Sequence, residues 1–217
     1  MGDNDAATSA VGSVARAGRP KSAEKARAVL EAASQLFLQQ GLQGTSMDAV
    51  ARAAGVSKQT VYGHFDNKES LFRACIRSKI EDHGFQIKEA SADVSDARST
   101  LLVLCRRFMA LKCDPEVVAM FRVVAAEAAT QPRIAGLFFE SGPGGARDAI
   151  AQVLDQLVAA GQLRPHDIDH ASWELMNMSA GSFHLRLLFG LLETIETTEL
   201  EAHLARIVDD FLAIYRC

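Results

Sequence analysis

Residues 45–68 read TSMDAVARAAGVSKQTVYGHFDNK, and this stretch predicts two short helices joined by a tight turn, followed by the start of a third. Ala51 is small enough to let the two helices approach closely. Gly55 can end the first of them, because glycine adopts a left-handed backbone without a side-chain penalty. Val61 should point back and fill the angle between them. The pattern indicates a helix-turn-helix whose second helix can lie in a DNA major groove.

Helix-start signals support this division of the stretch. Thr45 with Asp48, and Asp66 with Glu69, have the spacing of a capping box, and Ser57 is a favourable N-cap residue. Start signals at these intervals predict three consecutive short helices.

The side chains left on the outside of the second helix have the chemistry that DNA recognition needs. Lys58 can donate to guanine and Gln59 can bind adenine bidentately. Tyr62 offers a hydroxyl to a phosphate and a ring face to a thymine methyl group. Lys68, at the start of the next helix, adds a charge to exposed backbone N–H groups, which together form a phosphate site.

The composition is that of a globular chain with its positive charge concentrated in one part. The 217 residues are 48% hydrophobic and carry a net charge of −4. Residues 19–69 contain 7 Lys and Arg against 5 Asp and Glu, whereas residues 70–217 contain 15 against 20. The positive surplus therefore coincides with the helix-turn-helix, as expected for a DNA-binding segment.

Several function classes lack a signal in the sequence. We find no apolar run of membrane-spanning length and no secretory signal, so we expect a cytoplasmic protein without a membrane partner. The four cysteines have no CxxC or zinc spacing, and the six histidines are scattered, so we expect no metal site, no cofactor and no enzymatic activity. A redox role for the thiols stays open, and an enzyme on a helical fold remains a minor alternative.

The rest of the chain predicts an all-α fold of about nine helices. We expect a disordered leader over residues 1–18, a DNA-binding domain over 19–66, a connecting helix over 67–90, and a helical ligand-binding and dimerisation domain over 91–217. The leader is followed by a basic arm, Gly18 to Lys21, which either lies along DNA or is a solvated tail. Outside residues 45–66, the predicted helices span 21–40, 67–79 and beyond, 96–112, 115–130, 132–161 with an interruption at 142–145, 167–190 and 197–216.

The last two predicted helices carry broad apolar stripes that favour a homodimer formed through a four-helix bundle. The alternative is that the stripes form the core of a single chain. The stripe residues are Trp173, Met176, Ala180, Phe183 and Leu187 on the first helix, and Leu200, Leu204, Ile207, Val208, Phe211, Leu212 and Tyr215 on the second.

With these features in view, residues 19–79 resemble the DNA-binding domain of TetR-family regulators, especially the AcrR-like branch. The resemblance rests on the G-R-P-K arm, on G-x-x-x-T-S-M-x-x-V-A from Gly41, on A-G-V-S-K-Q-T-V-Y-G-H-F from Ala54, and on N-K-E-S-L-F from Asn67. The C-terminal part is more weakly similar to AefR-like regulators, through D-P-E-V-V-x-M-F-R and L-F-F-E-S-G-P.

The resemblance implies a ligand-responsive transcriptional regulator, most simply a repressor that binds a palindromic operator as a dimer. It assigns phosphate contacts to Thr45 and Ser46, recognition-helix contacts to Lys58, Gln59, Thr60 and Tyr62, and phosphate contacts at helix ends to His64 and Lys68. Gly63 departs from the pattern, because many members have a larger side chain there, which removes one potential contact.

The resemblance also implies a small-molecule site in the C-terminal domain, which we expect to take apolar or amphipathic effectors. Alternatives are a constitutive repressor without a ligand and an activator. Candidate ligand-binding residues, chosen as apolar or amphipathic side chains on central helices, are Phe108, Met109, Met120, Phe121, Phe138, Trp173, Met176, Asn177 and His184.

Overall fold

The structure of the chain, a computed structural model, describes residues 19–85 and 96–217, and it confirms the all-α fold class. The expected leader lies outside the described residues, as do residues 86–95 in and beyond the expected connecting helix. The described residues form eleven helices and one isolated antiparallel bridge between Leu163 and Arg216. The helices are α1 (Arg19–Gly44), α2 (Met47–Ala53), α3 (Lys58–His64), α4 (Lys68–Asp82), α5 (Ala97–Cys113), α6 (Pro115–Ala128), α7 (Pro132–Ser141), α8 (Pro143–Ala159), α9 (Ile168–Ala180), α10 (Phe183–Leu188) and α11 (Thr197–Tyr215).

Two differences from the expected helices account for the larger number. The segment predicted over 132–161 is two helices, since α7 ends at Ser141 and α8 begins at Pro143, as the Gly-Pro interruption indicated. The segment predicted over 167–190 is also divided, which the sequence analysis did not anticipate. It breaks at Gly181, whose φ of +48° ends α9 before α10 begins.

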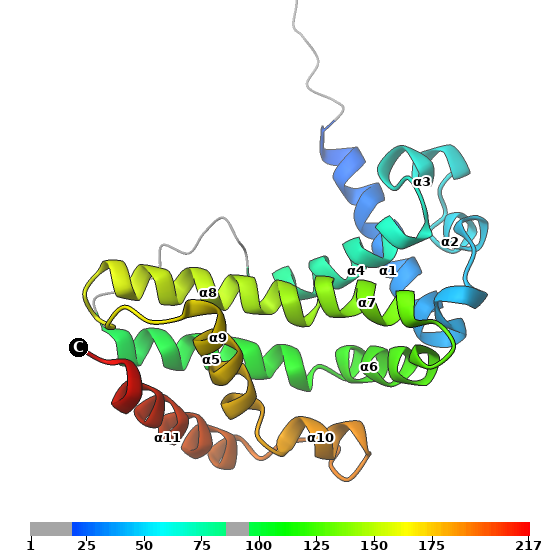
Figure 1. Cartoon of the computed structure of the whole chain (residues 1–217). Helices are drawn as coiled ribbons and strands as arrows, with labels where there is room; N and C mark the ends of the chain where they lie inside the picture. The colour runs from blue at the N-terminus through cyan, green and yellow to red at the C-terminus, as the bar shows by residue number, and fades with distance from the viewer. Residues whose placement is uncertain (1–18, 86–95) are drawn as a thin grey trace, which may run out of the picture.

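Helices α1 to α3 form one end of the molecule, and α5 to α11 form the larger body (Figure 1). α1 begins at Arg19, so the backbone of the expected basic arm is helical from that residue. α1 has a kink at Gly41 (φ 70°, ψ 176°), which confirms the predicted stop. Only glycine readily adopts this conformation.

The two parts are joined by packing of α4 and α1 against the body. α4 packs along α1 and also against α7 and α8, while α1 packs against α6. Arg133 of α7 pairs with Glu69 of α4 at 2.7 Å, and Arg73 of α4 lies 3.5 Å from Glu140 of α7. α4 therefore packs against both α1 and the larger body.

The core runs continuously from the small end into the body. Val29, Phe37 and Phe72 are fully or almost fully buried at the junction, and the rings of Phe37 and Phe72 meet edge to face with centroids 5.3 Å apart. Much of the predicted stripe of α11 belongs to the same core: Leu204, Val208 and Phe211 are completely buried within the chain. Those side chains therefore do not form an exposed surface for a second copy.

Candidate DNA-binding surface and effector cavity

The local geometry of α2 and α3 is that of the predicted helix-turn-helix. Ser57 caps α3 by accepting a hydrogen bond from the Thr60 backbone N–H at 3.1 Å. Gly55 has φ +65°, the left-handed conformation expected of the turn. Val61 is completely buried and Ala51 almost so, as predicted. α3 is consequently anchored by one face and free on the other.

Most of the predicted recognition residues lie on the free face of α3. Lys58, Gln59, Tyr62 and His64 are exposed, and the Tyr62 side chain is 52% exposed despite its large ring. Thr60 is half-buried, and its hydroxyl lies 2.9 Å from that of Ser57. At Gly63 no atom lies within 4 Å of the position that a Cβ would occupy, so the surface there is open.

Lys58 is paired within the chain. Its ammonium donates to the carboxylate of Asp48 on α2, and the two side chains remain 64% and 44% exposed. An exposed pair of this kind contributes about 0–1 kcal/mol, so it can be exchanged for another anion at little cost.

The predicted roles at the start of α2 need a correction of one residue. Ser46, not Thr45, is the N-cap and accepts from the Ala49 N–H at 3.1 Å. The Thr45 side chain is only 2% exposed, and its hydroxyl donates to the Gly41 carbonyl at 2.8 Å. The kink at Gly41 presents that carbonyl, so the Thr45 hydroxyl is already engaged and Ser46 is the exposed member of the pair.

The start of α4 shows the same shift. Asn67, not Asp66, is the N-cap, and it forms a capping box with Ser70 in place of the expected Glu69. Lys68 donates to the Gln43 carbonyl at 3.2 Å, and the His64 Nε2 lies 3.5 Å from the Ser22 hydroxyl. In this structure Lys68 therefore ties the start of α4 to α1, and His64 ties α3 to α1.

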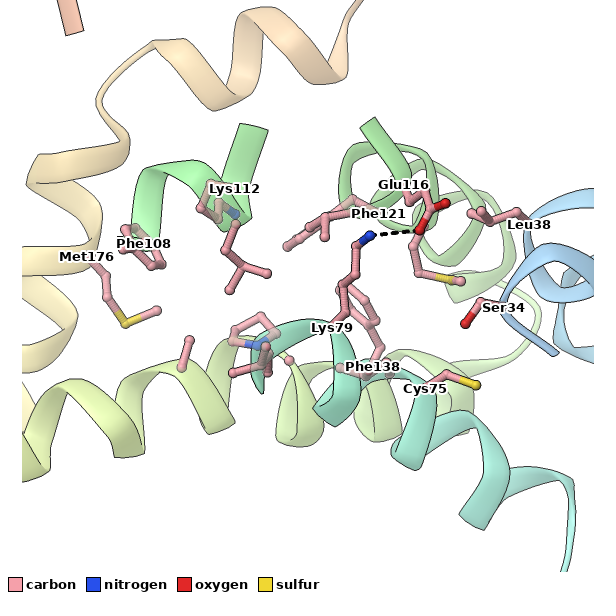
Figure 2. A pocket seen from close by; sticks show the side chains of 18 residues that line it. Ser34, Leu38, Cys75, Lys79, Phe108, Lys112, Glu116, Phe121, Phe138 and Met176 are labelled. Atoms are coloured by element: carbon pink, nitrogen blue, oxygen red, sulfur yellow. Dashed lines mark hydrogen bonds and ion pairs between the residues drawn. The ribbon is translucent and has the colours of Figure 1, made fainter. Parts of the chain in front are cut away.

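A cavity lies where α1 and α4 pack against the body, and α1 together with α4 to α9 lines it (Figure 2). It encloses about 740 Å³, counted with its opening to solvent. Its lining residues are Ser34, Leu38, Cys75, Ile76, Lys79, Ile80, Phe108, Leu111, Lys112, Glu116, Val117, Met120, Phe121, Phe138, Gly142, Pro143, Ala146 and Met176.

Five of the nine candidate ligand-binding residues line this cavity and four do not. The five are Phe108, Met120, Phe121, Phe138 and Met176. Met109 is fully buried in the core beside the cavity, and Asn177 is exposed. Trp173 stacks on the exposed ring of Phe139, with centroids 5.7 Å apart. His184 packs behind the wall, edge to face with Phe121.

The charged residues of the cavity wall were not among the predicted ligand-binding residues. Lys79 donates to Glu116 at 2.8 Å and lies 3.0 Å from the carboxylate of Asp114, which caps α6. Lys112 lies with its ammonium 4.1 Å from the centroid of the Phe121 ring. A signal was available, because Lys112 and Glu116 flank the Asp114-Pro115 break where two apolar helices meet.

Burial perturbs the titration of several groups around the cavity. Burial lowers the pKa of Lys112 to about 8. Burial and the Lys112 charge lower the pKa of His184 to about 4, so this imidazole is neutral at pH 7. Because the His184 Nδ1 faces the Lys112 carbonyl at 3.0 Å, Nδ1 carries the proton. Burial raises the pKa values of Cys75 and Cys113 to about 11, so both are thiols rather than thiolates.

Among residues 19–85 and 96–217, no group of three or more His, Cys, Asp or Glu side chains is arranged to hold a metal ion. Over the same part of the chain, no helix is long and apolar enough to cross a membrane.

Comparison with known families gives matches over both parts of the chain. Residues 99–217 match the family described as "AefR-like transcriptional repressor, C-terminal domain", and residues 29–75 match "Bacterial regulatory proteins, tetR family". Among curated proteins, the HTH-type transcriptional repressor KstR2 of Rhodococcus jostii is 32% identical over 95 residues, which cover 43% of this chain and 47% of KstR2. The chain thus spans about half the length of the first curated relatives it matches.

Solved structures match over most of the chain. The flavonoid-responsive regulator FrrA superposes with a TM-score of 0.70 at 31% identity, covering 89% of this chain and 98% of FrrA. A TetR transcriptional regulator from Agrobacterium tumefaciens gives a TM-score of 0.71 at 21% identity, covering 88% of this chain and 94% of that one, and shares its fold.

Proposed function

We propose a specific function for this chain, which belongs to the TetR family of bacterial regulatory proteins and has an AefR-like C-terminal domain. Members of the family are transcriptional regulators. This one is a ligand-responsive repressor that binds a palindromic operator as a homodimer. A small apolar or amphipathic effector releases it from DNA.

The DNA-binding unit is the segment 19–66, with α3 in the major groove. Lys58, Gln59, Thr60 and Tyr62 contact bases and neighbouring phosphates from the free face of α3. Ser46, His64 and Lys68 contact phosphates, and Thr45 contributes through its backbone N–H, because its hydroxyl is bonded to Gly41. Two copies of α3 about 34–36 Å apart would meet successive major-groove faces. Because the homodimer relates the two copies by a two-fold axis, the two half-sites of the operator form a palindrome.

One observation carries the ligand-responsive part of the proposal: the cavity shares a wall with the helix that follows α3. Cys75, Ile76 and Lys79 of α4 line the cavity, while the start of α4 follows α3 after three residues and its Lys68 donates to the Gln43 carbonyl of α1. In this proposal residues 67–90 connect the two units, and residues 91–217 bind the effector together with the α1 and α4 side chains that line the cavity. An effector that prefers one position of α4 shifts the spacing of the two copies of α3, and DNA must weaken effector binding by the same free energy.

The proposed homodimer forms through the last helices. Since the main stripe of α11 is buried in the chain, the contact surface is the outer side of α10, its following turn and α11. Large apolar side chains are exposed on α10 and its following turn, namely Leu185, Phe189 and Leu191, with Phe189 75% exposed, and Ile214 is exposed separately at the C-terminal end of α11. Large exposed apolar side chains grouped in one region are typical of protein interaction sites.

The test is selection of bound sequences from a random pool of duplex DNA, followed by screening of small molecules for release. We expect an enriched palindrome, a dimer on the DNA, and release by compounds that also protect the protein against thermal unfolding. A monomer that ignores duplex DNA at low ionic strength would refute the whole proposal. Specific binding that no compound in a broad apolar library reverses would refute the ligand-responsive part.

A further inference from the structure

The charges that line the cavity differ in whether they already have partners. Lys79 donates to Glu116 at 2.8 Å and lies 3.0 Å from Asp114. Asp114 also accepts from the backbone N–H groups of Glu116 and Val117, at 2.8 and 3.3 Å. Figure 2 shows the Lys79 ammonium directed at Glu116. These charges compensate one another, and a bound cation would have to displace Lys79 to reach either carboxylate.

Lys112 has no such compensation. Within the described part of the chain, no carboxylate lies at ion-pair distance from its ammonium, which instead lies over the Phe121 ring, 4.1 Å from the centroid. The low pKa of Lys112, about 8, is the consequence of this burial. A cation–π contact offsets only part of the cost of removing an ammonium from water, so Lys112 favours an additional anionic partner.

The remainder of the wall beside Lys112 is apolar. Phe108, Phe121, Phe138 and Met176 come from four different helices and line the same cavity as Lys112. A ligand that fits this wall needs a hydrocarbon or aromatic body together with one negative charge at the Lys112 end. A compact point charge such as an ammonium pairs well with a single carboxylate.

We propose that the effector is a small apolar monocarboxylic acid whose carboxylate pairs with Lys112 and whose hydrocarbon part contacts Phe108, Phe121, Phe138 and Met176. The inference rests on the proposed function of the cavity as the effector site, and it adds the chemical class of the effector. It also makes Lys112 the residue that distinguishes an acid from a neutral compound of the same shape.

The direct test is calorimetric titration of the full chain, without DNA, with two matched pairs of probes. The pairs are octanoate with methyl octanoate, and 4-butylbenzoate with its methyl ester. We expect at least one acid to bind at least tenfold more tightly than its ester. Equal binding of acid and ester in both pairs, or no binding by either acid, would overturn the inference, and neither result depends on a variant being folded.

Three variants assign the preference to one side chain. Lys112→Met keeps an apolar stem and removes the charge, so it should bind acid and ester equally while still binding the ester. Lys112→Arg keeps the charge and should retain most of the preference. Lys25→Met makes the same substitution at an exposed position of α1 away from the cavity and should behave as the original chain does. A preference for the acid that persists in Lys112→Met would overturn the assignment.

Failure of this inference is distinguishable from failure of the proposed function. If the acids bind with a Lys112-dependent preference but do not release operator DNA, the acid site stands and the ligand-responsive function is wrong. If neutral compounds release the DNA and the acids do not bind, the function stands and the acid site is wrong.

Discussion

The recognition surface and the cavity use lysine in opposite ways. On α3, Lys58 is 64% exposed and paired with Asp48, so its charge is screened by water and by a weak partner. In the cavity, Lys112 is half-buried and has only an aromatic ring beside its ammonium among the described residues. Exposed pairs contribute about 0–1 kcal/mol, whereas an uncompensated buried charge costs several times more.

This difference separates two kinds of recognition within one chain. On a surface whose ion pairs are weak, a lysine can exchange its carboxylate partner for a phosphate or a base at a small cost in free energy. This suits reversible binding to many DNA sequences. A buried cation instead discriminates strongly among ligands, because only an anion of the right size restores its lost interactions. The proposed effector site should therefore be more selective for charge than the DNA surface is.

The largest effect we expect concerns the junction between the two regions. Gly41→Ala should lower the free energy of unfolding by about 2–3 kcal/mol, because φ +70° with ψ 176° is strained for any residue with a Cβ. The new Cβ would also lie 1.8 Å from the present position of a Glu127 carboxylate oxygen, so that side chain must move. Chemical denaturation measures the loss.

A matched glycine provides the control. Gly63→Ala lies inside α3, with no atom within 4 Å of the new Cβ. Since alanine favours a helix, this variant should be more stable by about 0.5–1 kcal/mol. Equal effects of the two substitutions would show that the kink at Gly41 does not constrain the junction.

Gly41 also illustrates how much of the small end is readable from the sequence. Helix stops and caps depend on residues a few positions apart, so Gly41, Gly55, Ser57 and Val61 were predicted correctly. Two caps were placed one residue early because Thr45-Ser46 and Asp66-Asn67 each offer two capable side chains in a row. The choice at the first pair follows from the Thr45 bond to the Gly41 carbonyl, which only the folded kink presents.

The cavity was less predictable because it depends on contacts between helices distant in the sequence. Apolar residues can be recognised from their spacing, but spacing does not say which face of a helix borders a gap and which borders another helix. Met109 follows Phe108 directly, yet it lies in the core while Phe108 lines the cavity. Lys112 was missed because a lysine near a helix end normally indicates a solvated position.

The next effect tests the division of roles on the recognition surface. If Gln59 contacts a base, Gln59→Ala should reduce the binding free energy by about 1–3 kcal/mol and should relax base preference at one operator position. If Lys68 binds a phosphate, Lys68→Ala should weaken binding to all sequences and reduce the slope of log K against log salt by about 0.9. Binding to operator variants over a salt series measures both.

The structure adds a competing explanation for Lys68, because its ammonium bonds to the Gln43 carbonyl at 3.2 Å. If that bond is its main role, Lys68→Ala should lower thermal stability and leave the salt slope unchanged. A change of base preference in Lys68→Ala, with an unchanged slope, would contradict the assignment of roles altogether.

The third prediction uses the titration of Lys112. In the protein without ligand the pKa of Lys112 is about 8, and a bound carboxylate should raise this pKa. Binding of octanoate therefore takes up a proton above pH 8, so the affinity should be level near pH 6–7 and then fall, approaching tenfold per pH unit or about 1.4 kcal/mol. Calorimetry between pH 6 and pH 10 measures the profile.

Other groups around the ammonium titrate outside this range. The pKa of His184 is about 4 and that of Cys113 about 11, while bonds to Glu116 and Asp114 outweigh burial and raise the pKa of Lys79 above its usual range. Methyl octanoate provides the control, since its binding should not weaken between pH 7 and pH 9. If the affinity for the ester falls in parallel with that for the acid, the fold, and not Lys112, responds to pH.

The smallest effect concerns the pair between Lys58 and Asp48. Asp48→Asn frees the Lys58 ammonium and removes a negative charge beside the recognition helix, so operator affinity should rise by up to about fivefold, or 1 kcal/mol. Stability should change in the other direction, because a carboxylate in the first turn of α2 favours that helix by about 0.3–1 kcal/mol.

Asp66→Asn separates the two contributions to this gain. It removes an equal charge from an exposed position near the same face without freeing a lysine, so it reports the general electrostatic part alone. Suppose that Asp48→Asn raises operator affinity more than Asp66→Asn does. If this extra increase in affinity disappears when Lys58→Ala is added, the released Lys58 ammonium contacts DNA. If Asp48→Asn instead weakens binding, the pair with Asp48 serves to orient Lys58 toward the DNA.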